Sequence, residues 1–314
     1  MISLPETSRS YVICSLPSAS SEQRRVEYFH ADEYGILLDE VGNKFVIHPA
    51  ALSDFLSPQT EVSKEQHIAN VEKAVAEIKT GRLRKVIISR VKFMRRDYKQ
   101  LSELFSALLT AYPKAMVYLI NHEVYGCWMG ATPELLFEKR ENIYRTVSLA
   151  GTLPSAENLI WDQKLFDEQL IVTDFIKAKV ATIADGAVQV QGPETYNAGP
   201  VSHLCSRIEF KSDVDSDKVV KLLHPTPAIC GLPRDTAEQF IRNTETHQRR
   251  LYAGYLGIQR INGDVTFYVN LRCMQIFEDH FELHVGGGIT SDSKAKDEWQ
   301  ETENKALVLL NVMR

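Results

Sequence analysis

The chain has 314 residues, 44% of them hydrophobic, which is enough to bury a sizeable core in one large domain or two small ones. Its 36 basic and 41 acidic residues are spread along the chain and give a formal net charge of −5, so nucleic acid is not an expected partner. No apolar run approaches the roughly 18 to 20 residues of a membrane-spanning helix, and the first ten residues lack the pattern of a signal peptide. We therefore expect no membrane segment and a cytoplasmic location.

The first sixty residues contain short strand-like runs between polar turns, which we expect to form a sheet edge. A helix is expected from Ser63, whose side chain can cap it, to a stop at Gly81, and a strand follows over residues 84–92. Further helices are expected near 99–112, 162–182, 214–223, 233–247 and 295–313, and strands near 115–121, 123–129, 134–138, 142–148, 187–191, 203–210, 253–260, 264–276 and 280–286. Because most strands follow other strands, this order predicts an α+β fold of largely antiparallel sheets flanked by helices, in a single domain over residues 1–314.

Three glutamates occupy helix faces that otherwise carry apolar residues. In the last expected helix, steps of about 100° per residue place Glu298, Glu301 and Lys305 on a stripe that continues into apolar positions. Glu168 likewise shares a face with apolar neighbours three and four residues away. Unpaired carboxylates on such a face are costly, so the pattern indicates a Mg²⁺ site with carboxylate ligands. An ion pair between Glu301 and Lys305, or a helix end that reaches solvent, explains it as well.

Three strand segments carry further candidate groups. Lys85 lies among apolar strand residues, where a partly buried lysine can act as a base, although most strand lysines extend to solvent. Arg272 lies within an expected strand, where its guanidinium can bind a carboxylate or face solvent. Gly286, Gly287 and Gly288 follow a strand, where backbone N–H groups can approach an anion or form a tight turn.

Nine segments in order resemble the chorismate-utilising enzymes, a family of isochorismate, salicylate, anthranilate and aminodeoxychorismate synthases. The segments are KVIISR (85–90), GATPELLF (130–137), AGT (150–152), DEQLIVTDFI (167–176), HPTPAICGLPRDTAEQFI (224–241), RRLYAGYLG (249–257), NLRC (270–273), GGGITSDS (286–293) and DEWQETENK (297–305). The resemblance covers residues 62–314 as a catalytic core, with residues 1–61 as a shortened N-terminal strand region. It implies large, mainly antiparallel sheets around a central cleft.

The resemblance also implies a role for each matched position. Lys85 is then the base that activates water for attack at ring carbon C2 of chorismate, and Glu134 the acid that protonates the hydroxyl leaving C4. Mg²⁺ is the implied cofactor, with Glu168 and Glu301 as direct or water-mediated ligands and Glu298 in support. The implied substrate contacts are Arg272 and Tyr252 for the pyruvyl carboxylate, Lys305 with the backbone of Gly286, Gly287 and Gly288 near the ring carboxylate, and Thr152 and His224 in the pocket wall.

Within the family, Lys85 favours a member that uses water, because anthranilate synthases usually carry Gln there. Ala150 stands where aminodeoxychorismate synthases of the lysine-nucleophile type carry Lys, and the intact HPTPA segment favours release of isochorismate. We therefore expect a Mg²⁺-dependent isochorismate synthase that needs no glutamine-hydrolysing subunit, acts as a monomer or homodimer, and feeds menaquinone rather than siderophore synthesis. The alternatives are a salicylate synthase, which also eliminates pyruvate, and an inactive chorismate-binding scaffold.

Overall fold

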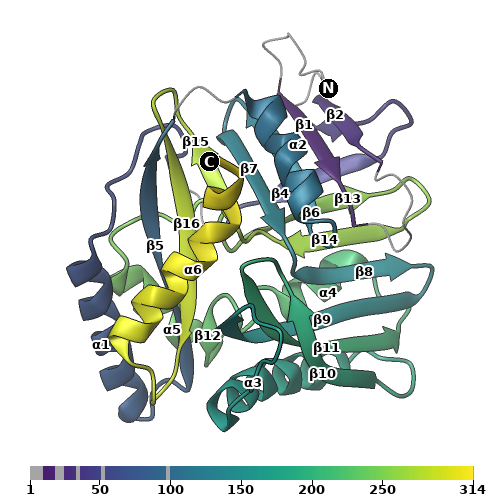
Figure 1. Cartoon of the computed structure of the whole chain (residues 1–314). Coiled ribbons are helices and arrows are strands. Elements are labelled where there is room, and N and C mark those ends of the chain that lie inside the picture. The colour runs from purple at the N-terminus through teal and green to yellow at the C-terminus, as the bar shows by residue number, and fades with distance from the viewer. Residues whose placement is uncertain (1–9, 18–24, 33–35, 51–53, 97–99, 314) are drawn as a thin grey trace.

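The computed structural model of the chain describes residues 10–17, 25–32, 36–50, 54–96 and 100–313 (Figure 1). Its strands form one 16-stranded sheet in which the strand pairs of the described residues are all antiparallel. The strands are β1 (Tyr11–Ser15), β2 (Glu27–Ala31), β3 (Leu37–Leu38), β4 (Lys44–His48), β5 (Lys85–Arg95), β6 (Met116–His122), β7 (Gly126–Thr132), β8 (Leu135–Arg140), β9 (Ile143–Pro154), β10 (Gln189–Asn197), β11 (Val201–Lys211), β12 (Gly231–Leu232), β13 (Tyr255–Gln259), β14 (Val265–Val269), β15 (Cys273–Ile276) and β16 (His280–Ile289).

The order of the strands brings distant parts of the chain together. Across the sheet it runs β10-β11-β9-β8-β14-β13-β4-β3-β2-β1-β6-β7-β15-β16-β5-β12. Figure 1 shows the β16–β5 end on the left and the β8 to β11 end at the lower right. The connection from β7 to β8 and the break between β14 and β15 lie between these two ends. The α+β class with a mainly antiparallel sheet is therefore confirmed.

Six helices cover the sheet in the described part of the chain. They are α1 (Lys64–Lys79), α2 (Leu101–Ala111), α3 (Gln163–Val180), α4 (Ser216–Leu223), α5 (Arg234–Thr244) and α6 (Ala295–Met313). Helix α6 packs on β16 and against α1 and α2, α3 packs on β9 and β11, and α5 packs on β5. Each interface buries an apolar cluster, and these clusters form the core. None of the described helices is long and apolar enough to cross a membrane.

The local signals explain where several elements begin. The hydroxyl of Ser63 accepts a hydrogen bond from the backbone N–H of Gln66 and caps α1, as expected. Asp162 caps α3 in the same way, through the N–H of Leu165.

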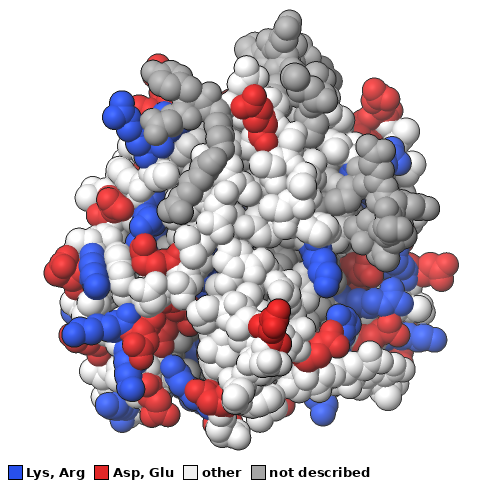
Figure 2. Space-filling model, viewed as in Figure 1, with Lys and Arg blue, Asp and Glu red and all other residues white. Residues whose placement is uncertain are grey.

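The five cysteines are all free thiols. On the face in Figure 2, acidic and basic side chains intermingle at both sides and uncharged surface fills much of the centre.

Two expectations about the strands were wrong, and the bounds of a third strand differ from those expected. Strands β1 to β4 lie in the interior of the strand order, between β13 and β6, and not at a sheet edge. The expected strand over 264–276 is broken into β14 and β15, because Arg272 adopts a left-handed backbone conformation with φ of 50°. The strand expected over 187–191 is the longer β10. Residues 1–9, on which the signal-peptide argument rests, and residue 99 of one expected helix lie outside the described residues.

Candidate active site

Two side chains of opposite charge open into one small buried cavity. Lys85 is the first residue of β5, and its side chain is 1% exposed. Glu134 follows β7 and is 4% exposed. Its backbone carbonyl accepts a hydrogen bond from Val269 N at 2.9 Å, which ties the connection to β14. Both residues line a cavity of about 50 Å³.

Burial gives Glu134 an unusual acidity. Desolvation raises the pKa of its carboxyl to about 7, although the positive charges of Arg272, Lys85 and Lys305 oppose the rise. A carboxyl with this pKa is half protonated at neutral pH and can donate a proton to a leaving group. Lys85 Nζ lies 2.8 Å from Glu168 Oε1 of α3, and this ion pair holds the amine in place. The site therefore contains a carboxyl that is half protonated at neutral pH and an amine that an ion pair holds in place.

The three glycines of β16 leave room for these side chains. A Cβ added at Gly288 would lie 2.5 Å from Glu168 Oε1 and 2.9 Å from Lys85 Cε. One added at Gly286 would lie 2.6 Å from the hydroxyl of Tyr252. Strand β15 pairs with β16 only as far as His284, so beyond that residue this side of β16 borders the cavity. The glycines thus provide both space and backbone groups at the cavity wall.

The three predicted metal ligands converge on the same wall. Glu168 comes from α3, and Glu298 and Glu301 come from the first turns of α6; the latter two approach a Cβ position at Gly287 to 3.3 and 3.4 Å. Each is paired with a lysine: Glu168 with Lys85, Glu301 with Lys305 at 2.6 Å, and Glu298 with Lys164 at 3.5 Å. Among the described residues, no three acidic, histidine or cysteine side chains stand close enough together to form a ready-made metal site.

The chemistry of these carboxylates nevertheless fits a divalent cation. Burial, together with the negative charges of Glu301 and Glu168, raises the pKa of Glu298 to about 7. Its Oε2 atom is buried and has no hydrogen-bond partner in the described structure. A hard cation such as Mg²⁺ would relieve this repulsion and use the orphaned oxygen. Glu168, Glu298 and Glu301 would hold it once the lysines release them.

Arg272 occupies the break between β14 and β15, where it reaches the cavity. Its Nη2 lies 2.9 Å from Nε2 of His203 on β11. Nδ1 of His203 lies 3.1 Å from the Gly151 carbonyl, which only accepts, so Nδ1 carries the proton and Nε2 receives the bond from Arg272. Burial and the charges of Arg272 and Lys305 hold the pKa of His203 well below its usual range, so the ring stays neutral. His203 therefore fixes the guanidinium, and Thr152, 3.2 Å from its Nδ1, lines the same cavity.

Sequence reasoning missed His203, because both faces of β11 are buried and no alternation separates its inward positions. It correctly grouped most of the other residues: Lys85, Glu134, Thr152, Glu168, Tyr252, Arg272, Gly286, Gly287, Gly288 and Lys305 line one cavity. Glu298 and Glu301 lie behind Gly287. Lys305 Nζ also donates to the Gly286 carbonyl at 3.0 Å, and burial raises the pKa of Tyr252.

The structure places His224 outside this cavity, contrary to the expectation. Its Nε2 lies 3.0 Å from the Ala253 carbonyl, and its ring meets Tyr255 edge-on at 5.2 Å. With these contacts, the His224 side chain lines a separate cavity of about 460 Å³, which His48 also lines. Ala228, four residues further along the chain, lines the cavity that contains Lys85 and Glu134, which we call the inner cavity.

Comparison with known proteins gives consistent matches. A family model for chorismate binding enzymes matches residues 24–314. Isochorismate synthase MenF of Escherichia coli is 30% identical over 264 residues, which cover 78% of this chain and 59% of that protein. Anthranilate synthase component 1 of Aquifex aeolicus is 26% identical over 292 residues, which cover 88% and 58%. The chain thus spans about 60% of the length of these curated relatives.

Among solved structures, the menaquinone-specific isochorismate synthase MenF from Escherichia coli superimposes with a TM-score of 0.74 at 22% identity, over 96% of this chain and 79% of that one. This likeness shows that the two proteins share a fold.

Proposed function

The chain belongs to the chorismate-binding enzyme family, and from this premise we propose that it is an isochorismate synthase, an isomerase that converts chorismate to isochorismate with Mg²⁺. The observation that carries the proposal is the placement of Lys85 and Glu134 in one buried cavity, with the pKa of Glu134 raised to about 7. A base and an acid at one ring are what a hydroxyl exchange requires. A protein that only binds chorismate needs neither.

In the proposed reaction, the amine of Lys85 accepts a proton from a water molecule as the oxygen of that water forms a bond to C2. The ring double bonds shift, the bond from C4 to its hydroxyl oxygen breaks, and the carboxyl of Glu134 donates its proton to the departing oxygen. One water is consumed and one is released, so the sum is an isomerisation.

The other residues of the cavity hold the substrate. Arg272, oriented by His203, and Tyr252 would bind the pyruvyl carboxylate. Lys305 and the glycine backbone face the ring carboxylate. Mg²⁺ bound by Glu168, Glu298 and Glu301 would neutralise that carboxylate. Since water is the nucleophile, no ammonia-supplying subunit is needed, and we propose that the product enters menaquinone synthesis.

The test is to incubate the purified protein with chorismate in ¹⁸O-labelled water, with and without Mg²⁺, and to resolve the products by chromatography with mass detection. We expect isochorismate that gains one ¹⁸O, only with Mg²⁺, and no change on adding ammonium. Salicylate with an equal amount of pyruvate would make the protein a salicylate synthase. Binding of chorismate without any product would instead identify a scaffold.

A further inference from the structure

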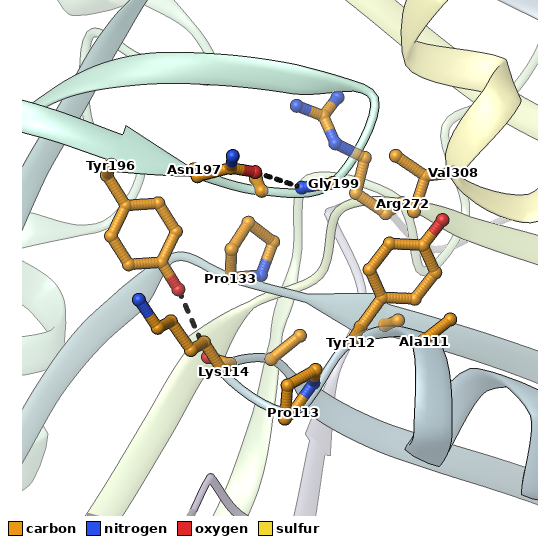
Figure 3. Close-up of a pocket in the computed structure, with 13 residues that line it drawn as sticks. Ala111, Tyr112, Pro113, Lys114, Pro133, Tyr196, Asn197, Gly199, Arg272 and Val308 are labelled. Atoms are coloured by element: carbon orange, nitrogen blue, oxygen red, sulfur yellow. Dashed lines mark hydrogen bonds between the residues drawn. The ribbon is translucent and has the colours of Figure 1, made fainter. Parts of the chain in front are cut away.

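A second cavity adjoins the inner one and has no role in the reaction described above. It encloses about 300 Å³ against about 50 Å³ for the inner cavity. Pro133 and Arg272 line both, so they form the partition between them. Figure 3 shows this outer chamber, with Tyr196 and Lys114 on one side and Tyr112 on the other.

The two volumes set an order of events. An inner cavity of about 50 Å³ has room for a few water molecules, since each needs about 10 to 15 Å³. A ring compound enters it only after internal contacts such as the Lys85–Glu168 ion pair give way. The outer chamber already has the size of a small-molecule site, for which about 300 Å³ is the lower end. A ring compound can therefore occupy the outer chamber first.

The lining of the outer chamber suits an anionic ring. Tyr112 and Tyr196, with neighbouring prolines and alanines, present aromatic and apolar surface. Its charged residues are Lys114 and Arg272, and no acidic residue lines it. No acidic side chain among the described residues forms an ion pair with Lys114, and the buried Nε of Arg272 has no hydrogen-bond partner there. The chamber thus presents two cationic side chains, Lys114 and Arg272, that no acidic residue of its lining neutralises.

The walls of the chamber are held in place before any ligand arrives. The hydroxyl of Tyr196 donates to the Lys114 carbonyl at 3.1 Å, and Asn197 Oδ1 accepts from Gly199 N at 2.9 Å (Figure 3). Gly199 has a φ of 85°, and a Cβ there would lie 2.5 Å from Cε1 of Tyr112. The turn between β10 and β11 therefore packs directly against Tyr112.

We propose that the outer chamber is a first binding subsite for the carboxylate substrate, in which Lys114 holds a carboxylate and the ring lies against Tyr112 and Tyr196. The substrate then passes between Arg272 and Pro133 into the inner cavity, where Arg272 binds its carboxylate. The identity of the anion as chorismate rests on the proposed function; the presence of a subsite for an anionic ring rests on the chamber itself.

The test compares Lys114→Gln with the wild type and with Lys73→Gln, a matched loss of an exposed lysine on α1. We expect Lys114→Gln to lower kcat/KM for chorismate at least about threefold at low ionic strength, with the difference shrinking as salt is added and kcat unchanged. Lys73→Gln should match the wild type. Ala198→Trp, which places a large ring at the chamber wall, should lower kcat/KM about tenfold or more with an unchanged melting temperature.

The outcomes separate the two proposals. If Lys114→Gln behaves like Lys73→Gln at both ionic strengths, or if Ala198→Trp keeps its full kcat/KM, the outer subsite is overturned while isochorismate synthesis stands. If the wild type makes no product, the proposed function fails by itself. The calorimetric Kd of chorismate for Lys114→Gln then decides the subsite: at least about threefold weaker binding supports it, and an unchanged Kd overturns it.

Discussion

Replacing Glu134 by glutamine removes the only proposed proton donor while keeping the size of the side chain. General acid catalysis typically contributes about 10²- to 10⁴-fold, so we expect kcat for Glu134→Gln to fall by about this factor, a rise of about 3 to 5 kcal/mol in the barrier. On the proposed mechanism, the reactive form of Glu134 in the wild type is the protonated one. Because the pKa of Glu134 in the ligand-free protein is raised to about 7, kcat/KM should fall as the pH rises beyond 7. The residual activity of Glu134→Gln should lack that decline.

The substitution that lowers activity should have the opposite effect on stability, because it should raise the free energy of unfolding at alkaline pH. A carboxyl whose pKa is higher in the folded than in the unfolded chain destabilises the fold wherever it must be ionised, so the penalty is absent below about pH 4.5 and complete above about 7. A rise from 4.5 to about 7 corresponds to about 3 kcal/mol at 1.36 kcal/mol per unit. Glu134→Gln should therefore be more stable than the wild type at pH 8, by up to about this amount, and no more stable at pH 4.5.

The assay measures isochorismate formation between pH 5.5 and 9 and the free energy of unfolding in urea at pH 4.5 and pH 8. The matched control is Glu72→Gln, which removes an exposed carboxylate on α1 and should change neither quantity. A mutant that retains more than a tenth of wild-type kcat would refute Glu134 as the acid. A mutant less stable than the wild type at pH 8 would refute the burial argument for its raised pKa.

Four other outcomes follow from the site. Lys85→Ala should abolish turnover while chorismate still binds in calorimetry, and retained turnover would exclude Lys85 as the base. His203→Asn should raise KM about tenfold with a smaller change in kcat, because Arg272 loses its partner; an unchanged KM would contradict this positioning role. Gly288→Ala should lower activity at least about tenfold in the product assay, because the new Cβ would lie 2.5 Å from a carboxylate oxygen, and full activity would show that the wall can yield. Removing Mg²⁺ with a chelator should stop turnover, and adding Mg²⁺ back should restore it. Turnover that persists in the chelator would refute the proposed need for Mg²⁺.

Much of the site was predictable because its residues break local rules. Glu168, Glu298 and Glu301 stand on otherwise apolar helix faces, and a helix has a fixed period, so their common direction can be derived without tertiary information. The structure places all three around the wall at Gly287 and Gly288. The lysine partner of Glu301 was also foreseen, since it lies four residues away on the same helix.

The parts that could not be predicted depend on long-range contacts. The sequence around Arg272 alternates without interruption and so predicts one continuous strand. The chain turns there because β14 pairs with β8 while β15 pairs with β7. His203 looks like one polar residue in an apolar strand until Arg272 is brought to it from 69 residues away. The central position of β1 to β4 depends on pairings with β6 and β13, which no local pattern encodes.

The pairing of each carboxylate with a lysine explains how one small cavity can hold so many charges before a substrate arrives. Lys85, Lys305 and Lys164 pair with Glu168, Glu301 and Glu298 in turn, so each of these carboxylates has a cationic partner without a ligand. A substrate with two carboxylates adds two negative charges and a divalent cation adds two positive ones. On the proposed function, the carboxylates would hold the cation in place of the lysines, and the lysines would then face the substrate. The charge balance would be kept if substrate and cation entered together, and Lys85 would be freed from Glu168 by the same event.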